Sequence, residues 1–104
     1  MSIKFRQEEI IKEFNLLEGD LEMSINYIIE LGNQLTSLPE RKKIDDFLVK
    51  GCQSKVWLYA EEKSQHIFFN ADSNTVVTKG LVSLLIRVLS GHSADEILNE
   101  EIYF

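Results

Sequence analysis

The residue with the clearest chemical potential is Cys52, the only cysteine among 104 residues. A thiolate is intrinsically nucleophilic, so this thiol is the most reactive side chain here at neutral pH. Gly51 precedes it and allows a tight backbone directly before the thiol. Residues 41–55 carry five basic residues and two acids, a local charge of +3 in a chain of net charge −6. Because nearby positive charge stabilises a thiolate, this stretch is a candidate for thiol chemistry.

The residue types alone leave a second reading of Cys52 open. A lone cysteine is often a small buried hydrophobe, so the chain could be an interaction module in which the thiol only packs. A stand-alone thiol peroxidase is disfavoured, because no second cysteine is present to resolve an oxidised thiol. His66 and His92 form no local signature with Cys52, and no metal or phosphate motif is present. Any chemistry is therefore expected at Cys52, without a metal or an organic cofactor.

Composition and charge narrow the class of protein. A hydrophobic content of 44% and a charged content of 27% are ordinary for one globular domain covering residues 1–104. The net charge of −6 argues against a nucleic-acid surface. A single cysteine fits a reducing compartment. The N-terminus lacks the apolar core of a signal peptide, and the apolar run 81–89 is short and contains Arg87, so no membrane span is expected. We predict a cytoplasmic protein.

The first half of the chain is predicted to be helical. Apolar residues recur at helical spacing over residues 3–18, and Gly19 is expected to end this helix. Asp20 is predicted to cap a second helix, which Gly32 is expected to end. Residues 33–46 are expected to connect this helical pair to the sheet.

Three strands are predicted after this connection. Residues 47–49 form a brief apolar run, which places the thiol in the loop after a short first strand. Residues 55–61 and 65–71 alternate between apolar and polar types across a polar turn at 62–64, as in an antiparallel hairpin. Aromatic residues on both faces of this hairpin predict that both faces are covered.

The last part of the chain is predicted to be helical again. Residues 72–74 are typical N-cap types and precede a strongly apolar helix that reaches about residue 90, with Gly91 as its stop. Ser93 and Glu96 fit a capping box for a short final helix. The fold class predicted from this order is α+β, with helices packed on a three-stranded antiparallel sheet.

The segment around the thiol also resembles a known family. Residues 51–58 read GCQSKVWL, which looks like the GCQSxVW signature of the SufE family of sulfur acceptors in iron–sulfur cluster assembly. The resemblance runs from about residue 10 to residue 104. Shorter matches in the same order support it: YIIELG at 27–32, LP at 38–39, ADS at 71–73 and KGL at 79–81.

The resemblance implies a fold and a role. Family members share the fold of IscU-type scaffold proteins, take sulfane sulfur from a PLP-dependent, SufS-like cysteine desulfurase, and pass it as a persulfide to a SufBCD-like scaffold. They also stimulate the desulfurase. Carried over, Cys52 is the sulfur acceptor, held at a loop tip and turned into an apolar pocket until the partner docks. The residues expected to support this loop or contact the partner are Gly51, Gln53, Ser54, Asp72, Ser73 and Asn74.

Two departures from the family pattern are visible in the sequence. Family members usually continue beyond the point that matches Phe104, through a Ser-Arg stretch and a C-terminal helix. We therefore expect this chain to be a fragment or a shortened member whose sheet or long helix is partly exposed. Relatives often carry Asp where this chain has Asn74, which predicts an altered partner-facing edge.

Overall fold

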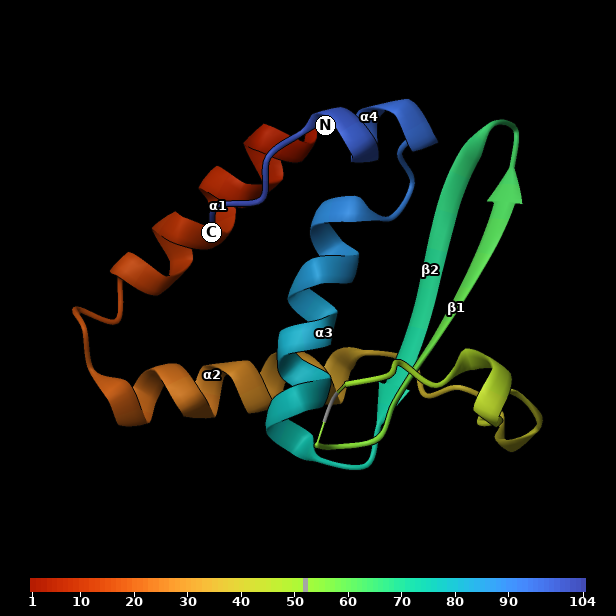
Figure 1. Ribbon diagram of the computed structural model, residues 1–104. Helices are drawn as coiled ribbons and strands as arrows, with labels where there is room; N and C mark the ends of the chain where they lie inside the picture. Colours follow the sequence, from red (N-terminus) through yellow and green to blue (C-terminus); the bar gives the residue numbers. More distant parts are fainter. Residues whose placement is uncertain (52) are drawn as a thin grey trace.

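A computed structural model describes residues 1–51 and 53–104. The chain forms α1 (Ile3–Asn15), α2 (Leu21–Gln34), the 3-10 turns η1 (Glu40–Lys42) and η2 (Asp45–Phe47), the strands β1 (Val56–Lys63) and β2 (His66–Ser73), α3 (Val76–Leu89) and α4 (Ala94–Asn99). Figure 1 shows α3 between the β1–β2 hairpin on one side and α1 and α2 on the other. The predicted α+β class, with helices packed on an antiparallel sheet, is confirmed.

The core lies where α3 meets α1. Leu84 and Val88 of α3 pack with Ile3 and Ile10 of α1, and all four side chains are buried. Further apolar residues cover this cluster from α1, α2, α3, α4 and the C-terminal segment: Phe14, Leu31, Leu89, Ile97 and Phe104. The apolar stripes expected from the sequence therefore face inward only in part, since Leu21 and Leu81, which belong to them, remain exposed.

The crossing of α2 and α3 depends on two glycines. Gly32 was expected to end the second helix, but α2 continues through it to Gln34, and Gly32 is buried. A Cβ atom at Gly32 would lie 2.6 Å from the backbone nitrogen of Gly80. The expectation was wrong because this glycine lies in a close helix–helix contact, where only a residue without a side chain fits.

The expected three-stranded sheet is wrong in its strand count. Within residues 1–51 and 53–104 the sheet has two antiparallel strands, with a register from Val56↔Ser73 to Lys63↔His66. Residues 47–49 form only the end of η2 and an isolated bridge between Leu48 and Trp57. Phe47 belongs to η2, so only two apolar residues, Leu48 and Val49, lie between this 3-10 turn and Gly51, which has a φ of +88°, and they are too few to extend a ladder.

The sequence also predicted a hairpin turn and cover on both faces of the hairpin, and the structure differs only in the position of the turn. The turn lies at Ser64 and Gln65, both with left-handed φ, one residue later than expected. One face of the hairpin packs on α3. The η1–η2 segment covers the other face, where Phe47 stacks edge-on against Tyr59 at 5.2 Å and the Lys42 ammonium lies 3.6 Å above the same ring.

A buried glutamine fastens the C-terminal segment to α1. Gln7 is fully buried, and its Nε2 donates to the carbonyl oxygen of Glu101 at 2.9 Å. Its Oε1 accepts from the backbone N–H of Tyr103 at 2.8 Å. One side-chain amide therefore satisfies two backbone groups of an extended segment, much as a neighbouring strand would. No helix in the described part of the chain is long and apolar enough to cross a membrane.

Candidate functional site

The flanks of the thiol loop are fixed at the open end of the hairpin. On the N-terminal flank, the backbone N–H of Val49 donates to the carbonyl oxygen of Val56 at 2.8 Å. Cys52 itself lies outside the described residues. Next to it, Gly51 is exposed and has a positive φ of 88°, and Gln53 is also exposed. The glycine before the thiol thus adopts the left-handed conformation that its residue type permits at little cost.

The C-terminal flank is held by residues of the β2–α3 junction. Lys55 exchanges two hydrogen bonds with Asn74: its N–H donates to Oδ1 at 3.0 Å, and its carbonyl accepts from the Asn74 N–H at 3.1 Å. The Ser73 hydroxyl also donates to the Lys55 carbonyl, at 2.8 Å. We call Ser73, Asn74, Thr75 and Thr78 the flank clasp.

The two threonines of the flank clasp donate hydrogen bonds to the hydroxyl oxygen of Ser54. The hydroxyl of Thr75 lies 3.0 Å from Ser54 Oγ, and that of Thr78 lies 3.4 Å from it. Residues 72–74 were expected to supply the N-cap of the long helix. Instead the N-cap of α3 is Thr75, which makes no side-chain capping bond. The side chains of residues 72–74 are instead engaged with neighbouring backbone groups, with Lys55 on the loop flank and with the connecting segment.

Asp72 is a buried junction between three parts of the chain. It is 3% exposed, and its carboxylate accepts from the backbone N–H groups of Leu38 and Ser73. The ammonium groups of Lys43 and Lys79 each lie 3.3 Å from it. Burial by itself would raise the pKa of this carboxyl, but the hydrogen bonds from Ser73, Lys79 and Lys43 together hold the pKa below its ordinary value. The carboxylate thereby holds the connecting segment, β2 and α3 together.

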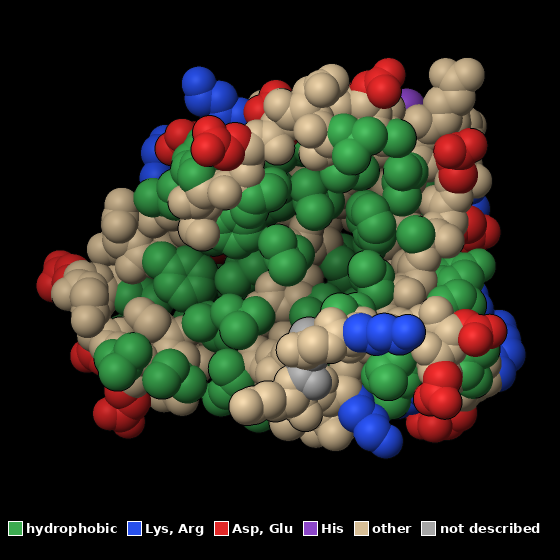
Figure 2. Space-filling model, in the orientation of Figure 1, with side chains coloured by type: hydrophobic (Ala, Val, Ile, Leu, Met, Phe, Trp, Pro, Cys, Tyr) green, Lys and Arg blue, Asp and Glu red, His purple; other side chains and the backbone are tan. Residues whose placement is uncertain are grey.

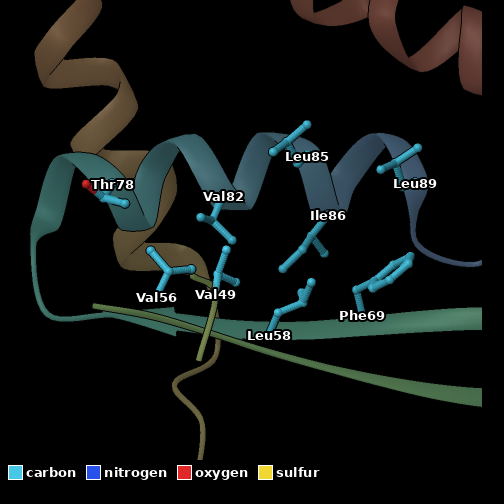
Figure 3. A pocket seen from close by; sticks show the side chains of 9 residues that line it. All are labelled: Val49, Val56, Leu58, Phe69, Thr78, Val82, Leu85, Ile86 and Leu89. Atoms are coloured by element: carbon cyan, nitrogen blue, oxygen red, sulfur yellow. The ribbon is translucent and has the colours of Figure 1, made fainter. Parts of the chain in front are cut away.

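An apolar cavity lies between the hairpin and α3. Its volume is about 300 Å³, and Figure 3 shows side chains from both sides of it. The lining residues are Val49, Val56, Leu58, Phe69, Thr78, Val82, Leu85, Ile86 and Leu89. Val49 and Val56 are also the pair that closes the N-terminal flank of the thiol loop. The cavity therefore begins where the loop leaves the hairpin.

The surface beside the cavity is also apolar. Figure 2 shows hydrophobic side chains gathered across the middle of one face, over the region of α1, α2 and α3. On α3, Val77, Leu81 and Leu85 follow one another at one-turn spacing and are 38%, 47% and 42% exposed. The partial exposure expected for the long helix is therefore present in the structure.

The two histidines lie away from the flanks of the thiol loop. His66 pairs with Lys63 beside the hairpin turn, whereas the loop flanks lie at the opposite end, next to Val56 and Ser73. His92 is buried, bridges to Ile67, and has Nε2 2.7 Å from the carbonyl oxygen of Met1. In the part of the chain that the structure describes, no three His, Asp, Glu or Cys side chains gather as a metal ion would require.

The structure brings together most of the residues expected at the site. Ser54, Ser73 and Asn74 meet at the C-terminal flank, and Asp72 lies buried behind them. Gln53 has no hydrogen bond to another described side chain. Sequence reasoning missed Lys43, Lys79, Thr75 and Thr78. The motif around Lys79 was noticed, but only the fold shows that its ammonium reaches Asp72.

The fold and the site together define a small α+β domain in which the segment around the single cysteine lies beside an apolar cavity. Residues 8–104 match SufE, the Fe-S metabolism associated domain. The chain therefore belongs to the SufE family, as the motif around Cys52 indicated.

Individual relatives agree with this assignment. The chain is 36% identical over 93 residues to the cysteine desulfuration protein SufE of Wigglesworthia glossinidia brevipalpis, covering 88% of this chain and 64% of that protein. It is 35% identical over 94 residues to an uncharacterized SufE-like protein of Rhizobium etli, covering 86% and 63%. It is also 35% identical to the chloroplastic/mitochondrial SufE-like protein 1 of Arabidopsis thaliana, covering 88% and 24%. The chain thus spans less than two thirds of these relatives.

Proposed function

We propose that this protein is a sulfur carrier that accepts sulfane sulfur on Cys52 from a PLP-dependent cysteine desulfurase. It passes the sulfur to a scaffold that assembles Fe–S clusters, and it stimulates the desulfurase by clearing its loaded cysteine. Residues 1–104 act as one domain in this role, in the reducing cytoplasm. Family membership supports the proposal, as does the name of the Wigglesworthia relative, a cysteine desulfuration protein.

The proposed step is transpersulfuration. The Cys52 thiolate attacks the outer sulfur of the donor persulfide, a new sulfur–sulfur bond forms on Cys52, and the bond in the donor breaks. The donor cysteine leaves as a thiolate, so the electron pairs balance and no external oxidant or reductant is consumed. Delivery to the scaffold repeats the step, with Cys52 as the leaving thiolate. Neither step requires a metal or organic cofactor on this chain.

The observation that carries the proposal is the apolar cavity next to the thiol loop. A persulfide has to be kept from free thiols and oxidants between acceptance and delivery. Val49 and Val56 hold the N-terminal flank of the loop and also line the cavity. The neighbours of Cys52, Gly51 and Gln53, are exposed, and the apolar pocket of about 300 Å³ lies beside them. This arrangement suits a group that reacts at the surface and is then protected from water and thiols.

The test compares wild type with Cys52→Ser. A serine hydroxyl is a poor nucleophile without an activating base and cannot take up sulfane sulfur, while the shape of the side chain barely changes. We expect wild type to gain one sulfur atom in intact mass after incubation with desulfurase and cysteine, and to raise desulfurase turnover at low reductant. Cys52→Ser should bind the desulfurase but gain no sulfur and give no stimulation.

The controls separate sulfur transfer from activation by docking. Ser64→Ala, at the exposed hairpin turn far from the loop flanks, should behave as wild type. Equal stimulation by Cys52→Ser, or no added mass on wild type that binds the desulfurase, would contradict the carrier function. If native Cys52 also resists alkylation until the protein unfolds, the interaction module with a packed cysteine explains the chain better.

A further inference from the structure

Two exposed lysines stand on either side of the single cysteine in the sequence. Lys50 comes two positions before Cys52, and Lys55 comes three positions after it. Both lysines are exposed, and in the described part of the chain neither ammonium group takes part in an ion pair. The hydrogen bonds of Lys55 come from its backbone alone. Both charges are therefore open to a partner that approaches the thiol loop.

The outer face of the hairpin continues this positive charge. Lys55 directly precedes β1, and side chains two positions apart share a face of a strand, so Lys55 shares the face of Trp57 and Tyr59. The Lys43 ammonium lies 5.8 Å from the centre of the Trp57 ring, and the Lys42 ammonium lies 3.6 Å from the centre of the Tyr59 ring. Cations therefore follow β1 outward from the thiol loop, on the face that turns away from the apolar cavity.

The opposite end of the hairpin is acidic. The turn between β1 and β2 lies far from the thiol loop, and α4 begins near this turn, because His92 bridges to Ile67 (Figure 1). Lys63, at the turn, lies 3.8 Å from the carboxylate of Glu61. Four exposed acids lie in the turn region and in α4: Glu61, Glu62, Asp95 and Glu96.

The end of the molecule around the thiol loop keeps an excess of positive charge. Residues 40–55 together with Asp72 and Lys79 carry six basic side chains and four acidic ones, although the whole chain has a net charge of −6. Exposed charges more than about 8 Å apart are largely screened at physiological salt, so the local charge decides what each end attracts. An acidic partner surface attracts this end and repels the end with the turn and α4, so that the thiol loop arrives first.

We propose that Lys50 and Lys55, which we call the cationic rim, guide the thiol loop onto an acidic surface around the donor cysteine of the desulfurase. The inference rests on the carrier function proposed above and adds the chemistry of the partner's surface. The rim acts on the rate of association more than on the lifetime of the complex, because exposed ion pairs contribute little free energy. A nucleic acid fits this region less well, since the exposed Asp45 and Asp46 of η2 interrupt its positive charge.

The experiment measures association with the desulfurase in the Cys52→Ser background, so that sulfur chemistry cannot affect the rates. Lys50→Gln combined with Lys55→Gln removes the charges of the cationic rim. Lys4→Gln combined with Lys12→Gln removes two exposed lysines of α1 and changes the net charge by the same amount. Glutamine keeps a long polar side chain, and all four lysines are exposed, so the thermal midpoints should change little.

Association and dissociation rates are measured by stopped flow at several salt concentrations. At about 20 mM NaCl we expect the rim variant to associate at least about threefold more slowly than Cys52→Ser, with a dissociation rate changed by less than about twofold. The difference should vanish at about 500 mM NaCl, where the Debye length is only about 4 Å. The α1 variant should associate as fast as Cys52→Ser at every salt concentration.

Equal association rates for the rim variant and the α1 variant at low salt would overturn the inference, as would a difference that high salt leaves unchanged. Failure of Cys52→Ser to bind the desulfurase at low salt would overturn it too. Rim-dependent binding to a duplex oligonucleotide that is tighter than binding to the desulfurase would also do so, because the partner would then be a nucleic acid. The carrier function fails separately, if wild type binds the desulfurase but gains no sulfur.

Discussion

Gly32 of α2 and Gly80 of α3 lie backbone to backbone where the two helices cross. A Cβ atom added to Gly32 would lie 2.6 Å from the Gly80 nitrogen and 2.9 Å from its Cα. Backbone atoms cannot yield as the end of a flexible side chain can, so any side chain at this point forces the helices apart. The missing side chains set the distance at which α2 packs on α3.

Gly32→Ala should therefore destabilise the protein although alanine favours helices. Overpacking typically costs about 1–3 kcal/mol, and the helix propensity of alanine returns at most about 1 kcal/mol of this. Urea unfolding gives the change in free energy of unfolding. Asn33→Ala, an exposed neighbour in the same helix, is the control and should be neutral or slightly stabilising. Equal midpoints for Gly32→Ala and Asn33→Ala would contradict the close crossing.

Leu84→Ala should empty a core position. Leu84 is 6% exposed and packs with Ile3, Ile10 and Val88. Removing a buried leucine side chain costs about 2–5 kcal/mol. The matched control is Leu81→Ala, one turn earlier on the same helix, where the side chain is 47% exposed and the loss should be less than half as large. Chemical unfolding of both variants measures the difference, and equal losses would show that the assigned core face of α3 is incorrect.

Asp72→Asn should lower the free energy of unfolding by an amount that depends on pH. The ionised carboxylate is stabilised by Lys43, Lys79 and two backbone N–H groups, and hydrogen bonds to a charged group contribute about 1.5–3 kcal/mol. Because the folded pKa of Asp72 lies below its unfolded value of about 3.9, its contribution is fully present well above pH 4. It is lost as pH falls through the folded pKa.

The free energy of unfolding of wild type and Asp72→Asn should accordingly differ most near neutral pH. The difference should shrink as the solution is acidified below about pH 4. Asp46→Asn, an exposed acid in η2, provides the control and should show little difference at either pH. If the difference in the free energy of unfolding between wild type and Asp72→Asn stays constant from pH 7 to pH 3, the carboxylate charge does not hold the three segments together.

Gln7→Leu should release the C-terminal segment from α1. The leucine leaves the Glu101 carbonyl and the Tyr103 N–H without their partner, and an unsatisfied buried polar group costs about 1–3 kcal/mol. The rate of amide hydrogen exchange at Tyr103 should rise more than the exchange rates of the amides in α3. Gln7→Glu keeps an acceptor for Tyr103 but no donor for Glu101, so its effect should be intermediate. Unchanged exchange at Tyr103 in Gln7→Leu would show that the amide does not hold the segment.

The helices and the hairpin could be predicted because the signals that define them, capping residues and apolar periodicity, lie within or next to each element in the sequence. Asp20 caps α2 by accepting from the Met23 N–H, and Ser93 and Glu96 form the expected capping box of α4. Alternation of apolar and polar residues placed β1 and β2 correctly. The predicted first strand was wrong because three apolar residues predict burial but do not determine a hydrogen-bonding partner.

The parts of the site that escaped prediction depend on contacts between distant segments. Asp72 was expected as an N-cap type near the loop, and only the fold brings Lys43 and Lys79 to its carboxylate. Asn74 reads as a helix cap, yet it binds Lys55 on the neighbouring strand. Gly32 reads as a helix stop until α3 is seen against it. In each case the residue type was noticed and its partner could not be.

The link from Gln7 to Glu101 and Tyr103 has a consequence for biosynthesis. Glu101 and Tyr103 follow Gln7 in the chain by 94 and 96 positions. Helix α1 therefore leaves the ribosome long before the C-terminal segment that covers it. At about 5–20 residues per second, that interval lasts roughly 5–20 s. During this time the nascent chain exposes the buried side of α1, and chaperones that bind emerging apolar segments have a defined period in which to act.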